Sequence, residues 1–119
     1  MDRSFLEANN IDVEKGIELL GDMDMYNATM EDYLTEINEK YPKLKEYLNN
    51  GDMENYSILV HSIKSDSKYL GFTTLAELAY DHELKSKDND IEYVNNNFNS
   101  LETEINRIIN IIKTYLGKE

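Results

Sequence analysis

The sequence predicts an all-α protein, an antiparallel four-helix bundle with a short N-terminal leader helix, in which residues 1–119 form a single domain. Two observations support this fold class. Apolar residues recur at steps of three and four along successive segments, which is the spacing of one helix face, and no segment shows the sustained alternation of a half-buried strand. Short clusters of glycine, asparagine and aspartate separate the segments, so the connections are of the length that joins antiparallel neighbours.

The leader helix is predicted over residues 13–20, with Asp12 as its N-cap and Gly21 as its stop. The second helix follows and ends at Asn49-Asn50-Gly51. Pro42 lies within the apolar stripe of this second helix. Because proline removes one backbone donor, we expect the helix to kink or break there, although its apolar face continues past the proline.

The third helix is predicted over residues 53–70, capped by Asp52 and closed by Gly71. The run Thr74-Leu75-Ala76-Glu77 has the pattern of a capping box and is expected to open the fourth helix, which extends to about Lys87. Both helices are long enough to cross the domain. They are therefore expected to pack side by side as an antiparallel pair.

The last helix is predicted to open at Asp90, and the leader helix is expected to cap one end of the core. The apolar stripe of this last helix has heptad-like spacing, which predicts packing along a neighbouring helix at a shallow angle. Its members are Ile91, Val94, Phe98, Leu101, Ile105, Ile108, Ile112 and Tyr115.

The composition excludes several classes of function. The chain has 24 acidic and 12 basic residues and a net charge of −12, which argues against nucleic acid and anionic lipid as partners. It has no cysteine, so disulfides, thiolate zinc sites and cysteine nucleophiles are excluded. No apolar run approaches the ~20 residues of a membrane span, and the N-terminus lacks a secretory signal. We therefore expect a soluble, cytoplasmic domain.

No metal site is predicted. His61 and His82 are far apart in sequence and have no cysteine to join them, which makes a poor zinc site. The acidic residues, including the cluster over residues 22–32, do not follow the calcium-loop pattern, and no glycine-rich phosphate loop is present.

His61, in the third helix, is a polar residue that packing of the bundle core does not explain. At about 100° per residue it projects nearly opposite the apolar face, and Lys64, Ser65 and Lys68 follow on its stripe. A neutral imidazole is a competent nucleophile near pH 7, and the two lysines would offset the charge of a phosphoryl group on the ring. From spacing alone, two interpretations are open: a solvated helix face, or an exposed imidazole that carries a charged group.

The run His61-Ser-Ile-Lys64-Ser65-Asp-Ser-Lys-Tyr-Leu70-Gly71 resembles the signature of histidine-containing phosphotransfer (HPt) domains. That signature has a lysine three residues after the histidine, a small residue four after it, and an aliphatic-glycine pair nine and ten after it. The resemblance covers nearly the whole chain, and Glu83 falls where the family has an acidic or amide residue. Two departures stand out: Ser65 replaces the more common glycine, and His82 takes a position that is often aliphatic.

The resemblance implies a module that relays phosphoryl groups between the aspartates of response-regulator receiver domains, often downstream of a hybrid sensor histidine kinase. Such a module is expected to be monomeric, with no kinase or phosphatase centre and no cofactor of its own, since the receiver holds the magnesium ion. The roles implied for the residues are phosphoacceptor for His61; charge stabilisation and docking for Lys64 and Lys68; clearance or a hydrogen bond to the phosphoryl group for Ser65; and support for Glu83 and Gly71.

His82 continues an apolar stripe of the fourth helix, so we expect a partly buried histidine satisfied by a carboxylate. The alternative is a group that helps to hold the phosphorylated ring. For the whole chain, the rival hypothesis is a non-catalytic helical interaction domain in which His61 is incidental. A kinase dimerisation domain is a third option, but that domain is normally a two-helix hairpin followed by an ATP-binding domain.

Overall fold

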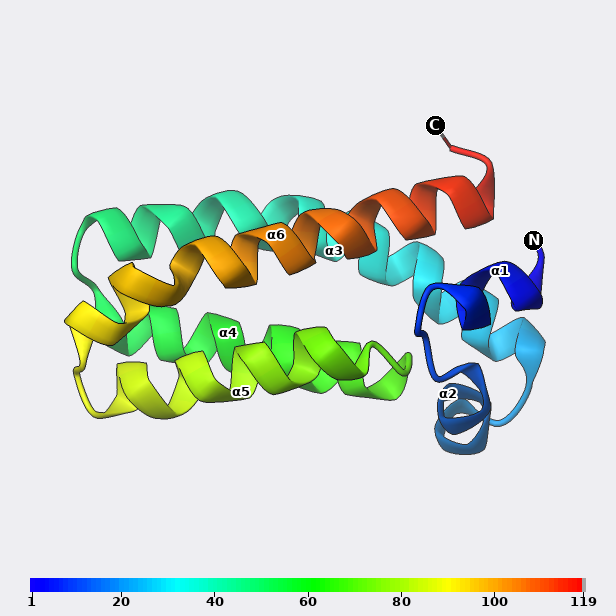
Figure 1. Ribbon diagram of the computed structural model, residues 1–119, viewed down its shortest axis with the longest axis horizontal. Helices are drawn as coiled ribbons and strands as arrows, with labels where there is room; N and C mark the ends of the chain where they lie inside the picture. The colour runs from blue at the N-terminus through cyan, green and yellow to red at the C-terminus, as the bar shows by residue number, and fades with distance from the viewer. Residues whose placement is uncertain (119) are drawn as a thin grey trace.

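The computed structural model describes residues 1–118, which fold into helices joined by short turns (Figure 1). No strand occurs in this range, so the prediction of an all-helical fold is confirmed. None of the helices within it is long and apolar enough to cross a membrane. The helices are α1 (Arg3–Ala8), α2 (Val13–Leu20), α3 (Met23–Asn49), α4 (Met53–Tyr69), α5 (Thr73–Lys87) and α6 (Ile91–Leu116).

Every helix except α5 begins at an aspartate whose side chain accepts a hydrogen bond from a backbone N–H of the first turn. A carboxylate satisfies a donor that has no partner within the helix, and its charge is favourable near the helix N-terminus. The predicted caps Asp12, Asp52 and Asp90 are confirmed.

The capping box predicted for the fourth helix is wrong. Helix α5 begins at Thr73, its N-cap is Phe72, and no side chain caps it. The reason is the turn that precedes it: Phe72 is buried and its N–H donates to the carbonyl oxygen of Ser67 at 2.9 Å. This tight turn after α4 moves the N-cap two residues earlier, from Thr74 to Phe72, and places Thr74 inside the first turn of α5.

Two further elements differ from the prediction. Of the kink or break predicted at Pro42, the break does not occur: helix α3 is continuous there, because the apolar face on either side of the proline, with Ile37 and Leu44, stays buried in the core. Helix α1 was not predicted, since it is one short turn with a single buried residue, Leu6. A hydrogen bond from Arg107 Nη1 on α6 to the carbonyl oxygen of Asn9, at 2.9 Å, fixes its C-terminal end.

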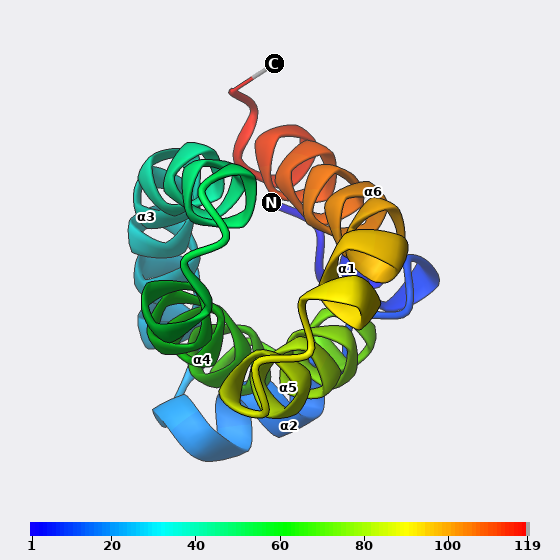
Figure 2. The same cartoon turned by 90° about the vertical axis from the view of Figure 1, so that its left-hand side faces the viewer.

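The long helices α3, α4, α5 and α6 surround one hydrophobic core, as Figure 2 shows in a view along the bundle. Each packs against two of the others: α4 against α3 and α5, and α6 against α3 and α5. The predicted stripe of α6 faces this core from Val94 onward, with Val94, Leu101 and Ile105 fully buried, whereas its first member, Ile91, is exposed. Helices α1 and α2 lie at the end of the bundle where α3 begins (Figure 1).

The turn between α4 and α5 is attached to the N-terminal part of the chain at Gly71. The N–H of Asp12 donates to the carbonyl oxygen of Gly71 at 2.9 Å, and the Tyr26 hydroxyl donates to that of Leu70 at 2.7 Å. Gly71 has a φ of +78°, and a Cβ added there would lie 2.0 Å from the carbonyl oxygen of Asp12. Only glycine combines this backbone conformation with so close an approach.

We expect Gly71→Ala to destabilise the protein by about 2–4 kcal/mol, the sum of left-handed strain and overpacking against Asp12. Urea unfolding followed by circular dichroism measures the loss. Gly117→Ala is the matched control, because Gly117 has a φ of +68° but nothing within 4 Å of an added Cβ. Equal losses for the two variants would show that the approach to Asp12 does not matter.

Candidate functional site

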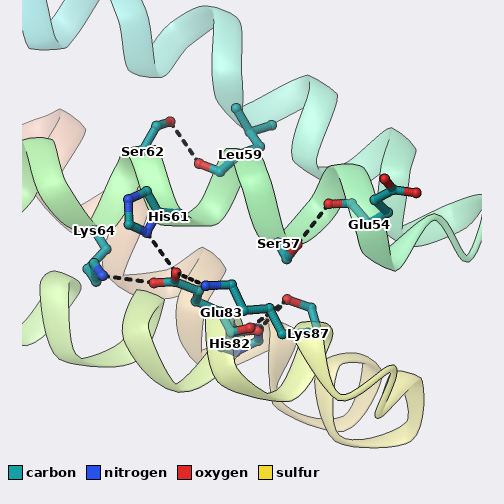
Figure 3. A network of polar contacts seen from close by, with 10 residues as sticks. Glu54, Ser57, Leu59, His61, Ser62, Lys64, His82, Glu83 and Lys87 are labelled. Atoms are coloured by element: carbon teal, nitrogen blue, oxygen red, sulfur yellow. Dashed lines mark hydrogen bonds and ion pairs between the residues drawn. The ribbon is translucent and has the colours of Figure 1, made fainter.

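The side chain of His61 stands on the outer face of α4 and is 53% exposed. Its Nδ1 lies 2.7 Å from Oε2 of Glu83 on the neighbouring helix α5 (Figure 3). A carboxylate oxygen only accepts hydrogen bonds, so Nδ1 carries a proton and, in the neutral ring, the lone pair is on Nε2. Figure 3 shows Nε2 on the side of the ring that faces away from Glu83. Nε2, the ring nitrogen with the free lone pair, therefore faces outward from the pair.

Glu83 is a buried carboxylate, with its side chain only 3% exposed, that holds together the basic groups of the site. Besides His61, it contacts Nζ of Lys87 at 2.8 Å through Oε2 and Nζ of Lys64 at 2.9 Å through Oε1. Burial by itself would raise the pKa of Glu83, but contacts with Lys64, Lys87 and His61 lower it to about 2. The carboxylate is therefore charged at neutral pH.

The two lysines of the His61 stripe are in different states. Lys64 is 21% exposed; its ammonium is paired with Glu83 and lies 5.2 Å from the centre of the Tyr80 ring. Lys68 is exposed and forms no ion pair within residues 1–118. Both line a cavity of about 600 Å³ between α2, α4 and α5, to which α2 contributes Lys15. Lys68 is thus the available cation of the stripe, whereas Lys64 is already neutralised.

The hydroxyl of Ser65 is a free hydrogen-bond donor. Ser57 and Ser62, also on α4, donate to carbonyl oxygens of their own helix at 2.8 Å (Figure 3), and Ser67 pairs with Tyr33. Ser65 is partly exposed and has no such partner in the described part of the chain. Its hydroxyl lies one turn beyond His61 on the same stripe.

His82 is buried, and the carboxylate partner predicted for it is wrong. Its Nε2 lies 3.2 Å from the carbonyl oxygen of Asn97 and its Nδ1 lies 2.8 Å from the Tyr56 hydroxyl. A carbonyl only accepts, so Nε2 donates and Nδ1 accepts from Tyr56. The carboxylate belongs to the adjacent residue: on α5, His82 faces the core while Glu83 faces His61. Glu83, rather than His82, contacts the His61 ring.

Sequence reasoning missed Lys87, which contacts the same carboxylate oxygen of Glu83 as His61 does. The signal was present as an i, i+4 acid–base pair on one helix, but such pairs are common on solvated helix faces. Of the residues predicted for the site, the structure brings together His61, Lys64 and Glu83, with Ser65 and Lys68 farther along the stripe and Gly71 in the turn beyond. Within residues 1–118 no group of three metal-ligating side chains is placed to hold a metal ion.

Comparison with models of known protein families matches residues 23–111 to the Hpt domain. The matched range includes α4 and α5 with the whole His61–Glu83 cluster, and it leaves out α1 and α2. Comparisons with curated proteins and with solved structures give no match.

We expect the buried His82 to make stability fall on mild acidification. Burial lowers the pKa of His82 below its ordinary value of 6.5, so the unfolded chain binds a proton that the folded protein resists. The stabilising contribution is present above about pH 6.5 and is lost as the pH falls toward the folded pKa. The pKa of Glu83 is lowered from 4.5, so its contribution is lost only below about pH 4.5.

Urea unfolding midpoints at pH 7.5 and 5.5 measure this effect, with His82→Gln as the neutral variant. The wild-type midpoint falls between the two pH values by more than that of the variant. Parallel changes in both proteins would contradict the assignment of this pH range to His82.

Proposed function

Because the chain belongs to the Hpt domain family, whose members transfer phosphoryl groups through a histidine in two-component phosphorelays, we propose that His61 is the phosphoacceptor of this chain. The observation that carries the proposal is the contact between Nδ1 of His61 and Oε2 of Glu83, with Nε2 facing outward. It supplies an exposed nucleophile in a fixed tautomer. The proposed exchange is with aspartates of receiver domains.

In the proposed reaction, Nε2 attacks the phosphorus of an aspartyl phosphate on the receiver. The Nε2–P bond forms, the bond from phosphorus to the carboxylate oxygen breaks, and its electron pair leaves with the aspartate. The Nδ1 proton stays between His61 and Glu83, where the carboxylate stabilises the positive charge that develops on the ring. Phosphoryl transfer depends mainly on in-line placement and charge neutralisation. We propose that the receiver brings the magnesium ion and that this domain contributes no kinase or phosphatase centre of its own.

We assign different tasks to the residues around His61. The exposed ammonium of Lys68 faces the incoming phosphoryl group and the receiver, whereas Lys64 balances Glu83 and reaches the phosphoryl group only by giving up part of that pairing. The Ser65 hydroxyl is free to donate to a phosphoryl oxygen, and its small size leaves the approach to the ring open. Gly71 supports the site indirectly by holding the end of α4.

The wider assignment follows from the same reasoning. We propose an antiparallel four-helix bundle, which is supported by the direction of the chain through α3–α6 in Figure 1 and by the short turns between them. We propose that the domain works as a monomer in the cytoplasm with a hybrid sensor histidine kinase upstream. The net charge of −12 supports a protein partner in preference to nucleic acid or an anionic membrane.

We expect His61→Gln to abolish acceptance of phosphate from a receiver domain phosphorylated with acetyl phosphate. The wild-type protein is expected to gain a phosphohistidine signal in ³¹P NMR that is stable in alkali and lost in acid. His82→Gln is the matched control and retains transfer, because His82 is buried. If His61→Gln accepts phosphate as well as the wild type does, the proposal fails and a non-catalytic interaction domain becomes the better explanation.

We expect Ser65→Ala to lower the equilibrium share of phosphate on this domain, relative to the receiver, by about fivefold, which corresponds to ~1 kcal/mol for one hydrogen bond to a charged group at an exposed site. Radiolabelled transfer followed to equilibrium measures the share. Ser62→Ala is the control, since the Ser62 hydroxyl already donates to Leu59. If Ser65→Ala leaves the equilibrium share of phosphate unchanged, the Ser65 hydroxyl does not bond the phosphoryl group, and the side chain contributes only its small size.

A further inference from the structure

One carboxylate oxygen in the site has two basic partners. Oε2 of Glu83 lies 2.7 Å from Nδ1 of His61 and 2.8 Å from Nζ of Lys87, while Oε1 takes Lys64. His61 comes from α4 and Lys87 from the last turn of α5, so two helices meet at this atom. The Lys87 side chain is 57% exposed and Glu83 is buried, which leaves the lysine free to move and the carboxylate fixed.

We propose that Lys87 is a positioning residue that acts through Glu83 and sets how readily the phosphoryl group leaves His61. The inference rests on the proposed role of His61 as phosphoacceptor. Lys87 lies outside the stripe of His61 and does not touch the ring; its effect passes through the oxygen that it shares with Nδ1.

The chemistry of the leaving group gives the direction of the effect. When phosphorus is bound to Nε2 and Nδ1 keeps its proton, the N–P bond breaks with its electron pair returning to Nε2, and the ring leaves as neutral imidazole. Without that proton the ring would leave as an imidazolate anion, which is a far poorer leaving group. The phosphoryl group passes to a carboxylate of the receiver or to water, and transfer to water gives inorganic phosphate.

Lys87 weakens the hold of Glu83 on the Nδ1 proton. A free carboxylate beside Nδ1 would stabilise the protonated, phosphorylated ring, whereas a second cation on the same oxygen offsets that stabilisation. The groups that face Glu83 are His61 and Lys64 from α4 and Lys87 from its own helix, while His82 turns to Tyr56 and to Asn97 of α6. Lys64 binds the other oxygen and belongs to the stripe, so Lys87 is the group whose removal isolates the effect.

The test measures the rate of phosphohistidine loss against pH in the full chain, phosphorylated with phosphoramidate in the absence of any receiver. For the wild type, the rate falls as the pH rises, and the midpoint of this fall is the pH at which half of the phosphorylated rings have lost the Nδ1 proton. In Lys87→Met the midpoint is expected to move up by roughly half a unit to one unit, which makes loss above the midpoint about three to ten times faster. In Glu83→Gln the midpoint is expected to move to lower pH, because the carboxylate that stabilises the protonated ring is gone. Lys87→Arg keeps the charge and stays near the wild type.

Lys85→Met is the matched control, because it removes the same charge from α5 while Lys85 lies over the Tyr93 ring. It should leave the midpoint in place, and Lys87→Met should add no shift in a Glu83→Gln background. Equal shifts for Lys85→Met and Lys87→Met, a shift that survives without the Glu83 carboxylate, or no shift at all would overturn the proposal.

Failure of the proposed function gives different results. A phosphoryl group on His61 that is lost at a rate dependent on Lys87, but that never passes to a receiver, would refute the proposed relay function and leave this inference standing. A normal relay with an unshifted midpoint would refute the inference alone. If the wild type gains no more phosphohistidine than His61→Gln does, both the relay function and the role of Lys87 are refuted.

Discussion

The contact between the buried carboxylate of Glu83 and the exposed ring of His61 links the fold to the chemistry of this domain. A carboxylate with 3% exposure is costly unless cations and hydrogen bonds replace its water, and Lys64, Lys87 and His61 do so. The same contact fixes the His61 tautomer. The arrangement that satisfies the buried charge of Glu83 is therefore the same one that, in the proposed function, orients the nucleophile.

This arrangement depends on the register between α4 and α5. A shift of one residue along α5 would bring His82 or Leu84 opposite His61 in place of the carboxylate. The register is held at the turn, where Gly71 approaches Asp12 too closely for any side chain, and Tyr26 donates to the Leu70 carbonyl. Residues 1–22 lie outside the family match, yet Asp12 makes the contact with Gly71 that holds this turn. The N-terminal segment thus contributes to the geometry of the site from a distance.

The charge of the domain is distributed unevenly around this site. The net charge is −12, but the face around His61 carries Lys64, Lys68 and Lys87, and the nearby acid Asp66 turns away to pair with Lys40 on α3 at 2.9 Å. Long-range repulsion of polyanions and local acceptance of a single phosphoryl group are therefore compatible. Glu83 pairs with Lys64 and Lys87, which leaves Lys68 as the exposed cation of the His61 stripe that has no ion pair within residues 1–118.

The sequence by itself determined the helical segments other than α1, the caps Asp12, Asp52 and Asp90, and the position of His61 opposite the apolar face of α4. These features depend on spacing along one helix and on residues adjacent in the chain, so a local pattern is enough to predict them. The capping box expected at Thr74 was wrong, and of the kink or break expected at Pro42 the break does not occur, because packing of Ile37, Leu44 and Phe72 outweighed a local preference. Only the tertiary structure decided which partner each polar group has: Tyr56 for His82, Glu83 for Lys64, and one oxygen of Glu83 for both His61 and Lys87. Those pairings depend on how α4 and α5 are rotated and aligned against each other, and that alignment is set by the whole core together with the contact between Gly71 and Asp12.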